Sequence, residues 1–181
     1  PYPPSSVALA AIREAAGEGL RLYPDPEGSD LREALAACYD VKPEQVFLGN
    51  GSDEILAFAF QAFFDPAKEI VFPDVTYSFY PVYAGLFGIP YREIPLDEHF
   101  GVPVERFIGG NGGGGLANPN APTGRELSLS ALREILEGNP DVVVVVDEAY
   151  VDFGARSALE LLDRCLNLLV VRTMSKSRSL A

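Results

Sequence analysis

This sequence has little positive charge, no long apolar run and nothing that resembles a signal peptide. Its 181 residues include 14 lysines and arginines against 26 aspartates and glutamates, which leaves a net charge of -12. Nucleic acid and anionic membranes repel an acidic protein, so we expect neither as its main partner and predict a small-molecule ligand. Since no stretch of about 18 apolar residues is present, we expect no membrane span and a cytoplasmic location.

Cysteine and histidine are also scarce. The two cysteines, Cys38 and Cys165, have no CxxC or other metal-ligand spacing. The single histidine, His99, lies beside Asp97 and Glu98 in an acidic stretch, where a solvated loop residue is the simpler interpretation. We therefore expect no metal site and no chemistry that depends on histidine.

Hydrophobic residues are plentiful, at 48% of the chain, and this content excludes a disordered protein. Helical periodicity alternates with short apolar runs that suit strands, and short turns join them. This alternation predicts an α/β domain with a mainly parallel sheet. We expect helices over 5–16, 31–39, 55–63 and 128–137, another that starts near Thr76, and strands over 46–48, 69–73, 89–94, 142–146 and 168–171.

Two strands in the last third of the chain end in reactive side chains. The run Val142–Val146 leads to Asp147 and Tyr150, and the run 168–171 leads to Ser175 and Lys176. Strands without polar alternation are covered on both faces, and they present ligands at their carboxyl ends. If the acid, the phenol and the amine converge there, they meet the usual needs of pyridoxal phosphate: an acid for its protonated ring and a lysine for its aldehyde.

A phosphate site is one interpretation of the turn that follows residues 46–48. There Gly51 and Ser52 open a helix, whose first backbone N–H groups and dipole favour an anion. Glycine and serine are also what any tight turn requires, so both interpretations stay open. Asp53 would crowd a phosphate if it pointed inward, and we expect it to cap the helix.

Several loop residues have a functional and a structural interpretation. Tyr77, at the end of a strand, can stack on a planar ring or fill the core with its aromatic neighbours. Tyr23 lies on a stiff, proline-containing loop.

We expect the glycine-rich run 109–115 to be mobile. The stretch 116–124 should be a loop that presents Asn120, with two X-Pro bonds that admit a cis peptide.

Five motifs in order resemble the aspartate-aminotransferase-like pyridoxal-phosphate enzymes, and within them the histidinol-phosphate aminotransferases. The likeness covers nearly the whole chain. The motifs are Gly51-Ser52-Asp53-Glu54, Tyr77, Asn118-Pro119-Asn120-Ala121-Pro122-Thr123-Gly124, Asp147-Glu148-Ala149-Tyr150 and Ser175-Lys176.

The resemblance implies the large domain of that fold, a three-layer α/β sandwich with a mainly parallel central sheet. It implies an N-terminal segment with a dimer-contact loop at 1–28, a cofactor-binding domain at 29–181, and a small C-terminal domain that is missing. The chain begins without an initiator methionine and ends soon after Lys176. We therefore interpret it as part of a longer protein.

The resemblance also implies a role for each motif residue. Lys176 forms the Schiff base with the cofactor and shuttles a proton, Asp147 pairs with the ring nitrogen, and Tyr77 stacks on the ring; these three are the expected catalytic residues. The expected cofactor-binding residues are Gly51, Ser52, Asp53, Tyr77, Asn120, Asp147, Tyr150, Ser175, Lys176 and, from the partner subunit of a homodimer, Tyr23. The family places an asparagine at the position of Ala121, and Asn120 is the nearest substitute.

We predict a pyridoxal-phosphate-dependent aminotransferase of histidine biosynthesis, which transfers the amino group of histidinol phosphate to 2-oxoglutarate. An aminotransferase for aromatic or other amino acids shares every motif, and so does a decarboxylase of phosphorylated amino acids. A non-catalytic α/β binding module is the remote alternative. The residues that choose the substrate lie, by the resemblance, beyond Ala181.

Overall fold

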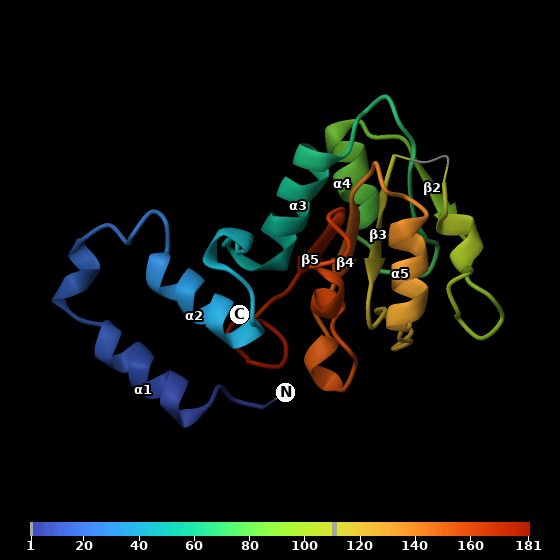
Figure 1. Ribbon diagram of the computed structural model, residues 1–181. Helices are drawn as coiled ribbons and strands as arrows, with labels where there is room; N and C mark the ends of the chain where they lie inside the picture. The colour runs from blue at the N-terminus through green and yellow to red at the C-terminus, as the bar shows by residue number, and fades with distance from the viewer. Residues whose placement is uncertain (1, 110–111) are drawn as a thin grey trace. The chain divides into compact units, whose positions relative to one another are not determined.

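The computed structural model describes residues 2–109 and 112–181, which form two compact units (Figure 1). One unit runs to Asn50 and includes Met174–Ala181, and the other is Gly51–Thr173. The predicted boundary at residue 28 is defined by contact with a second subunit, and it stays a prediction.

The larger unit is built on one parallel sheet. In the described residues five strands lie in the order β2-β1-β3-β4-β5, and every neighbouring pair is parallel. This arrangement confirms the predicted α/β class. The strands are β1 (Ile70–Pro73), β2 (Tyr91–Ile94), β3 (Gly114–Ala117), β4 (Val144–Asp147) and β5 (Leu168–Val171).

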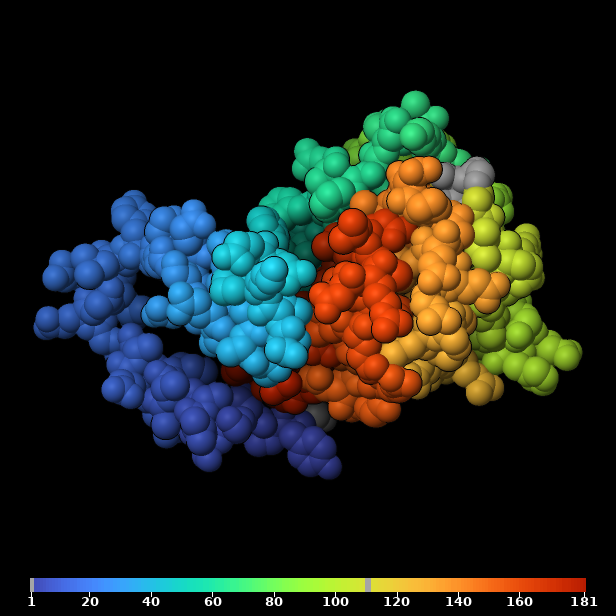
Figure 2. Space-filling view, in the orientation of Figure 1, coloured from blue at the N-terminus to red at the C-terminus, as the bar shows by residue number. Residues whose placement is uncertain are grey.

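Helices cover both faces of this sheet, which confirms the predicted three layers. The helices α3 (Gly51–Phe63) and α4 (Tyr80–Phe87) lie on one face, and α5 (Leu129–Glu137) lies on the other (Figure 1). Within the described part of this unit there are also three short 3₁₀ helices: η3 (Val104–Phe107), η4 (Val151–Phe153) and η5 (Ala158–Leu161). Figure 2 shows η5 beside α5 on that second face.

The valines of β4 show why the strand carries no polar alternation. Val145 packs with the aromatic core under α3 and α4, while Val144 and Val146 pack with the core under α5. Successive strand residues point to opposite faces, so both kinds of position must be apolar when both faces are covered. Burying each such side chain contributes roughly 1.5–3 kcal/mol.

The central strand β3 differs from the prediction. Gly114 and Gly115 were expected in a mobile run and Leu116 in a loop, but all three are buried in β3; residues 110 and 111 of that run lie outside the described residues. The reason is a close backbone approach. A Cβ on Gly114 would lie 2.1 Å from the carbonyl oxygen of Val71 in β1, so only glycine fits there.

The predicted strand over 46–48 is wrong. These residues follow the 3₁₀ helix η2 (Pro43–Gln45) in irregular backbone. They belong to the smaller unit, whereas the sheet lies in the larger one. A strand forms only with a neighbour to pair with, so the apolar pattern is not sufficient here. The helix expected from Thr76 begins at Tyr80 instead.

The smaller unit contains little core of its own. Its helices are α1 (Ser6–Ala15), η1 (Glu18–Arg21), α2 (Ser29–Tyr39) and η2, so the predicted helices over 5–16 and 31–39 are confirmed. Ser5 caps α1 by accepting a hydrogen bond from the Ala8 amide at 3.2 Å. No residue of α1 is buried, and Val7 and Ile12 are 78% and 53% exposed. None of the helices in the described residues is long and apolar enough to cross a membrane.

Candidate active site

Asp147 is the centre of the candidate site. It ends β4, aligned with Ala117 of β3 and Val171 of β5, and it is only 5% exposed. The alternation of the strand places its side chain on the α3 and α4 side with Val145. Its Oδ1 accepts a hydrogen bond from the Ala149 amide at 3.0 Å, and the Tyr80 hydroxyl lies 3.5 Å from Oδ2.

Burial raises the pKa of Asp147 to about 6. The hydrogen bonds from Ala149 and Tyr80 partly offset this effect, and the charges of Asp53 and Glu148 add to it. The groups that act on this carboxylate are therefore two donors and two negative charges. A cation placed against it would reverse the shift, because opposite charges favour the ionised form.

Tyr77 is hydrogen-bonded to Asp53 and packs against Tyr80, which lies beside Asp147. The Tyr77 hydroxyl donates to Asp53 Oδ1 at 2.6 Å, and the rings of Tyr77 and Tyr80 meet edge to face at 5.7 Å. Desolvation, followed by the hydrogen bond with Asp53, raises the pKa of Tyr77 well above its usual range. Tyr77 is therefore a neutral donor at physiological pH. Asp53, which we expected to cap α3, accepts this bond from a residue far along the chain.

Gly51 and Ser52 start α3 in the same turn as Asp53. Gly51 has a φ of +82°, a left-handed conformation that side chains rarely adopt, so glycine suits the start of this helix. The first amides of a helix have no partner within it, and they carry the positive end of the helix dipole. The turn therefore offers donors for an anion, although Asp53 and Glu54 add negative charge to it.

Asn120 fastens its loop to the end of β1. Its Oδ1 accepts from the Thr76 hydroxyl at 2.8 Å, and its Nδ2 donates to the Val75 carbonyl at 2.8 Å and to the Thr123 hydroxyl at 3.0 Å. Both X-Pro bonds of this loop, at Pro119 and Pro122, are cis. Both amide hydrogens of Asn120 are thus engaged within the protein. Its role as a cofactor contact stays a prediction.

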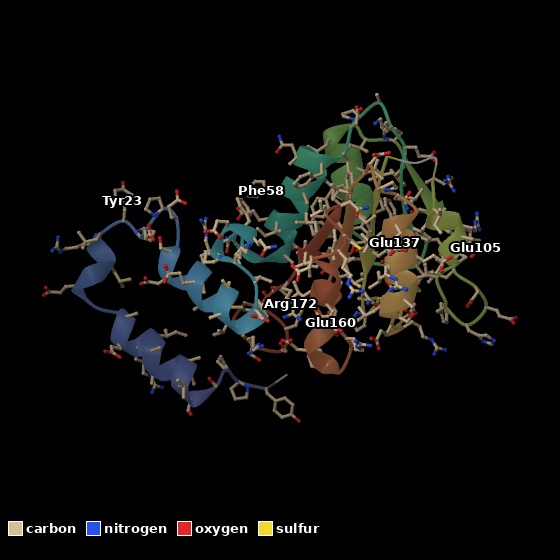
Figure 3. All side chains as sticks on the ribbon, viewed as in Figure 1. Tyr23, Phe58, Glu105, Glu137, Glu160 and Arg172 are labelled. Atoms are coloured by element: carbon tan, nitrogen blue, oxygen red, sulfur yellow. The ribbon has the colours of Figure 1, made fainter. Side chains whose placement is uncertain are left out.

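The remaining predicted residues lie further out or in the smaller unit. Tyr150 is 38% exposed, directly before η4, with its ring 6.1 Å from that of Phe153. Tyr23 is 99% exposed and projects from its unit (Figure 3). Ser175 and Lys176 lie in a turn in which the Ser179 amide donates to the Lys176 carbonyl at 3.2 Å. These last three are located only within the smaller unit.

The larger unit thus brings Asp147, Tyr77 and Asp53 together. The sequence alone did not single out two neighbours of Asp147: Tyr80, which lies at the site, and Glu148, which faces away from it. Tyr80 follows Tyr77 by three residues, and that spacing is a signal, although it suits core packing equally well; Tyr77 lies on the loop before α4. Glu148 is buried beside Asp147. Adjacent acids at the end of a buried strand point to opposite faces, so one of them had to face away from the site.

Comparison with known proteins places these residues in a family. The family model for aminotransferase class I and II matches residues 1–181. Histidinol-phosphate aminotransferase 1 of Bordetella parapertussis is 57% identical over all of this chain and 52% of its own length. The Pseudomonas aeruginosa protein of the same name is also 57% identical, again over 100% and 52%. The chain spans about half the length of the curated relatives it matches.

Solved structures agree with the fold. The histidinol-phosphate aminotransferase of Sinorhizobium meliloti, crystallised with pyridoxal-5'-phosphate, matches with a TM-score of 0.87 and 26% identity over 98% of this chain and 50% of its own. A Thermus thermophilus aspartate aminotransferase mutant matches with a TM-score of 0.86 and 25% identity, over 96% and 52%. The L-threonine-O-3-phosphate decarboxylase of Porphyromonas gingivalis shares the fold, with a TM-score of 0.79 and 23% identity over 95% and 54%. Because the family model matches its whole length, the chain belongs to the aminotransferase class I and II family.

Proposed function

We propose that this chain is the cofactor-binding part of a pyridoxal-phosphate-dependent aminotransferase that transfers the amino group of histidinol phosphate to 2-oxoglutarate. One observation carries the proposal: a buried carboxylate, Asp147, ends a central strand with a tyrosine pair beside it. The 57% identity to histidinol-phosphate aminotransferases supports the choice of substrate.

The residues present fit the cofactor. Asp147 is buried, and the negative charges of Asp53 and Glu148 act on it, so its carboxylate complements a protonated ring nitrogen. Such a pair at about 4 Å is worth roughly 4 kcal/mol at an effective dielectric near 20. The ring of Tyr77 suits a planar heterocycle, and the first turn of α3 suits a phosphate. When bound, the cofactor supplies a ring that draws electrons from the substrate α-carbon.

Each protein residue has a defined task in this proposal. Asp147 keeps a proton on the ring nitrogen, which a neutral residue could not do. Lys176 would hold the aldehyde carbon of the cofactor through Nζ and, once the substrate amine has displaced it there, would move the proton that leaves the substrate α-carbon. Tyr150 would donate to the phenolic oxygen of the ring. The phosphate would be held by Gly51, Ser52, Asp53 and Ser175.

We also propose a homodimer in which Tyr23 reaches the partner's phosphate site. Tyr23 is almost fully exposed, and apolar residues near it, Leu20 and Leu22, are 75% and 61% exposed. Exposed apolar side chains close together in the chain suit a protein–protein contact. Amino acids and 2-oxo acids are the proposed substrates, and the cytoplasm is the proposed compartment.

The proposal is tested with the full-length protein and pyridoxal phosphate. Reduction with borohydride should fix the cofactor to Lys176, which peptide mass spectrometry detects, and the Lys176→Ala variant should take up no label. A label on another lysine would remove Lys176 from the mechanism.

A substrate assay then separates this function from its alternatives. Histidinol phosphate with 2-oxoglutarate should yield glutamate without carbon dioxide. Release of carbon dioxide from a phosphorylated amino acid would favour the decarboxylase, which shares this fold. Faster transfer from aromatic amino acids would assign the enzyme to a different substrate. A protein that shows no cofactor absorbance would be a binding module.

A further inference from the structure

A second buried carboxylate lies next to Asp147, and the proposed function does not use it. The side chain of Glu148 is 0% exposed. It contacts Ser157 and Ala158, at the start of η5, so it lies on the α5 side of the sheet. Asp147 lies on the opposite side with Val145. Glu148 therefore cannot contact a ligand held by Asp147.

Three donors satisfy the Glu148 carboxylate. Its Oε2 accepts from Arg172 Nε at 3.0 Å and from the Ser157 hydroxyl at 2.8 Å, and its Oε1 accepts from the Ala158 amide at 2.5 Å. Arg172, labelled in Figure 3, is itself 20% exposed in its side chain. Hydrogen bonds to a charged, buried group are short and strong, so they define the position of both partners.

These contacts join the ends of two neighbouring strands. Glu148 follows the last residue of β4, and Arg172 follows the last residue of β5. The Glu148 amide also donates to the Val171 carbonyl at 2.7 Å. Backbone and side chain of Glu148 thus both hold β4 to β5 at the carboxyl edge of the sheet. Beyond Arg172 the chain continues through Thr173 towards Ser175 and Lys176.

Other ion pairs of the larger unit differ in burial. Arg156 with Glu160, and Arg133 with Glu137, are pairs whose side chains are about half exposed or more. Exposed pairs contribute little to structure, because water competes for both charges. Among these pairs only Glu148 with Arg172 combines a fully buried acid with a place at the edge that carries Asp147.

We propose that Glu148, held by Arg172 and Ser157, is a positioning residue that sets where Asp147 lies relative to the strand end leading to Lys176. The inference rests on the proposed function, in which Asp147 holds the ring nitrogen of the cofactor. Glu148 acts through Asp147 and the strand ends, and it does not touch the reacting atoms.

The test compares Glu148→Gln with wild type in the full-length protein loaded with pyridoxal phosphate. Glutamine has the same shape but no charge, so it holds Arg172 less firmly. We expect kcat to fall about tenfold with KM changed less than about threefold. We also expect the pH midpoint of the bound cofactor's visible absorbance to rise. When Asp147 is displaced, the ring nitrogen of the cofactor loses its proton more readily. Less positive charge then lies near the Lys176 nitrogen, so the pKa of that nitrogen increases.

The control is Glu160→Gln, which removes the exposed pair with Arg156 in the same unit and should leave kcat and the midpoint unchanged. A second variant, Ser157→Ala, removes one donor to Glu148 and should also raise the midpoint, by a smaller amount than Glu148→Gln. It keeps the proposal testable when Glu148→Gln is insoluble.

Each outcome decides between the two proposals. A wild-type protein that neither binds the cofactor nor transfers an amino group would overturn the proposed function itself. An active wild type with an unchanged midpoint in both Glu148→Gln and Ser157→Ala would overturn the positioning role. A lower unfolding midpoint in denaturant without a change in the absorbance titration would also overturn it, because Glu148 would then be purely structural.

Discussion

At the scale of single residues, the burial of Asp147 suits its proposed function but lowers the stability of the folded protein. Its pKa is raised by burial from 3.8 to about 6, so the folded protein binds its proton more tightly than the unfolded chain does. As pH rises from about 4 to about 6, the unfolded chain loses this proton first, and the stability of the folded state falls. Above about pH 6 the loss of folded-state stability caused by this group reaches its full size.

We predict that Asp147→Asn stabilises the cofactor-free protein at pH 7.5 by about 3 kcal/mol, since each unit of pKa shift corresponds to about 1.4 kcal/mol. At pH 5 the gain should be about half as large, because the wild-type carboxyl is then largely protonated in the folded state. Urea denaturation at the two pH values measures both numbers. The same variant should lose most turnover. A gain that does not depend on pH would show that burial of the charge is not its cause.

Substitution of Asn120 should have the opposite effect on stability. Its side chain connects Thr76, Val75 and Thr123. Asn120→Ala leaves the partly buried Val75 carbonyl and the hydroxyls of Thr76 and Thr123 without this partner, so it should destabilise the cofactor-free protein by about 1–3 kcal/mol. Urea denaturation without cofactor is the measurement, and Thr123→Val, which removes one acceptor, should have a smaller effect. If Asn120 served the cofactor alone, the cofactor-free protein would keep its stability.

At the scale of elements, the sheet depends on glycine at one position of β3. A Cβ at Gly114 would lie 2.1 Å from the Val71 carbonyl oxygen, which is backbone and cannot turn aside. We predict that Gly114→Ala destabilises the protein by about 3 kcal/mol or more, because it forces β1 and β3 apart.

Gly115 offers the matched control in the same strand. A Cβ there would meet the Tyr80 ring at 3.7 Å, an ordinary contact. Gly115→Ala should therefore change stability by less than about 1 kcal/mol. Circular dichroism during urea unfolding compares the two variants, and equal effects would mean that the close approach to β1 is not what requires Gly114.

At the scale of the whole molecule, the proposed dimer makes a complementation test possible. Tyr23→Phe damages the site that Tyr23 reaches, and Lys176→Ala damages the site of its own subunit. If Tyr23 reaches the partner, a mixed dimer has one site in which both residues are intact. Mixing the two variants after unfolding and refolding should restore up to about a quarter of wild-type activity by random pairing.

The matched control mixes each variant with itself under the same conditions, and it should show no such recovery. If Tyr23 serves its own subunit, every mixed site keeps at least one defect. Activity that equals the mean of the separate variants would therefore contradict the shared site.

Much of this molecule is readable from local pattern. The apolar runs of β4 and β5, the amphipathic α5 and the serine cap of α1 are properties of neighbouring residues, so the sequence alone predicts them. The residue types that follow β4 and β5, together with the order of the motifs, also indicate the chemistry without any knowledge of the tertiary contacts.

Contacts between distant residues depend on packing, and no local pattern reports them. Gly114 resembles part of a flexible run in the sequence, because its backbone approach to Val71 involves another strand. In the sequence Asp53 resembles a helix cap, because no local pattern shows that Tyr77 is its partner. Tyr77 lies on a loop that only the folded sheet brings near. Asp147 and Glu148 are adjacent acids in the chain, and the layers on the two faces of the sheet direct the first to the candidate site and the second to Arg172.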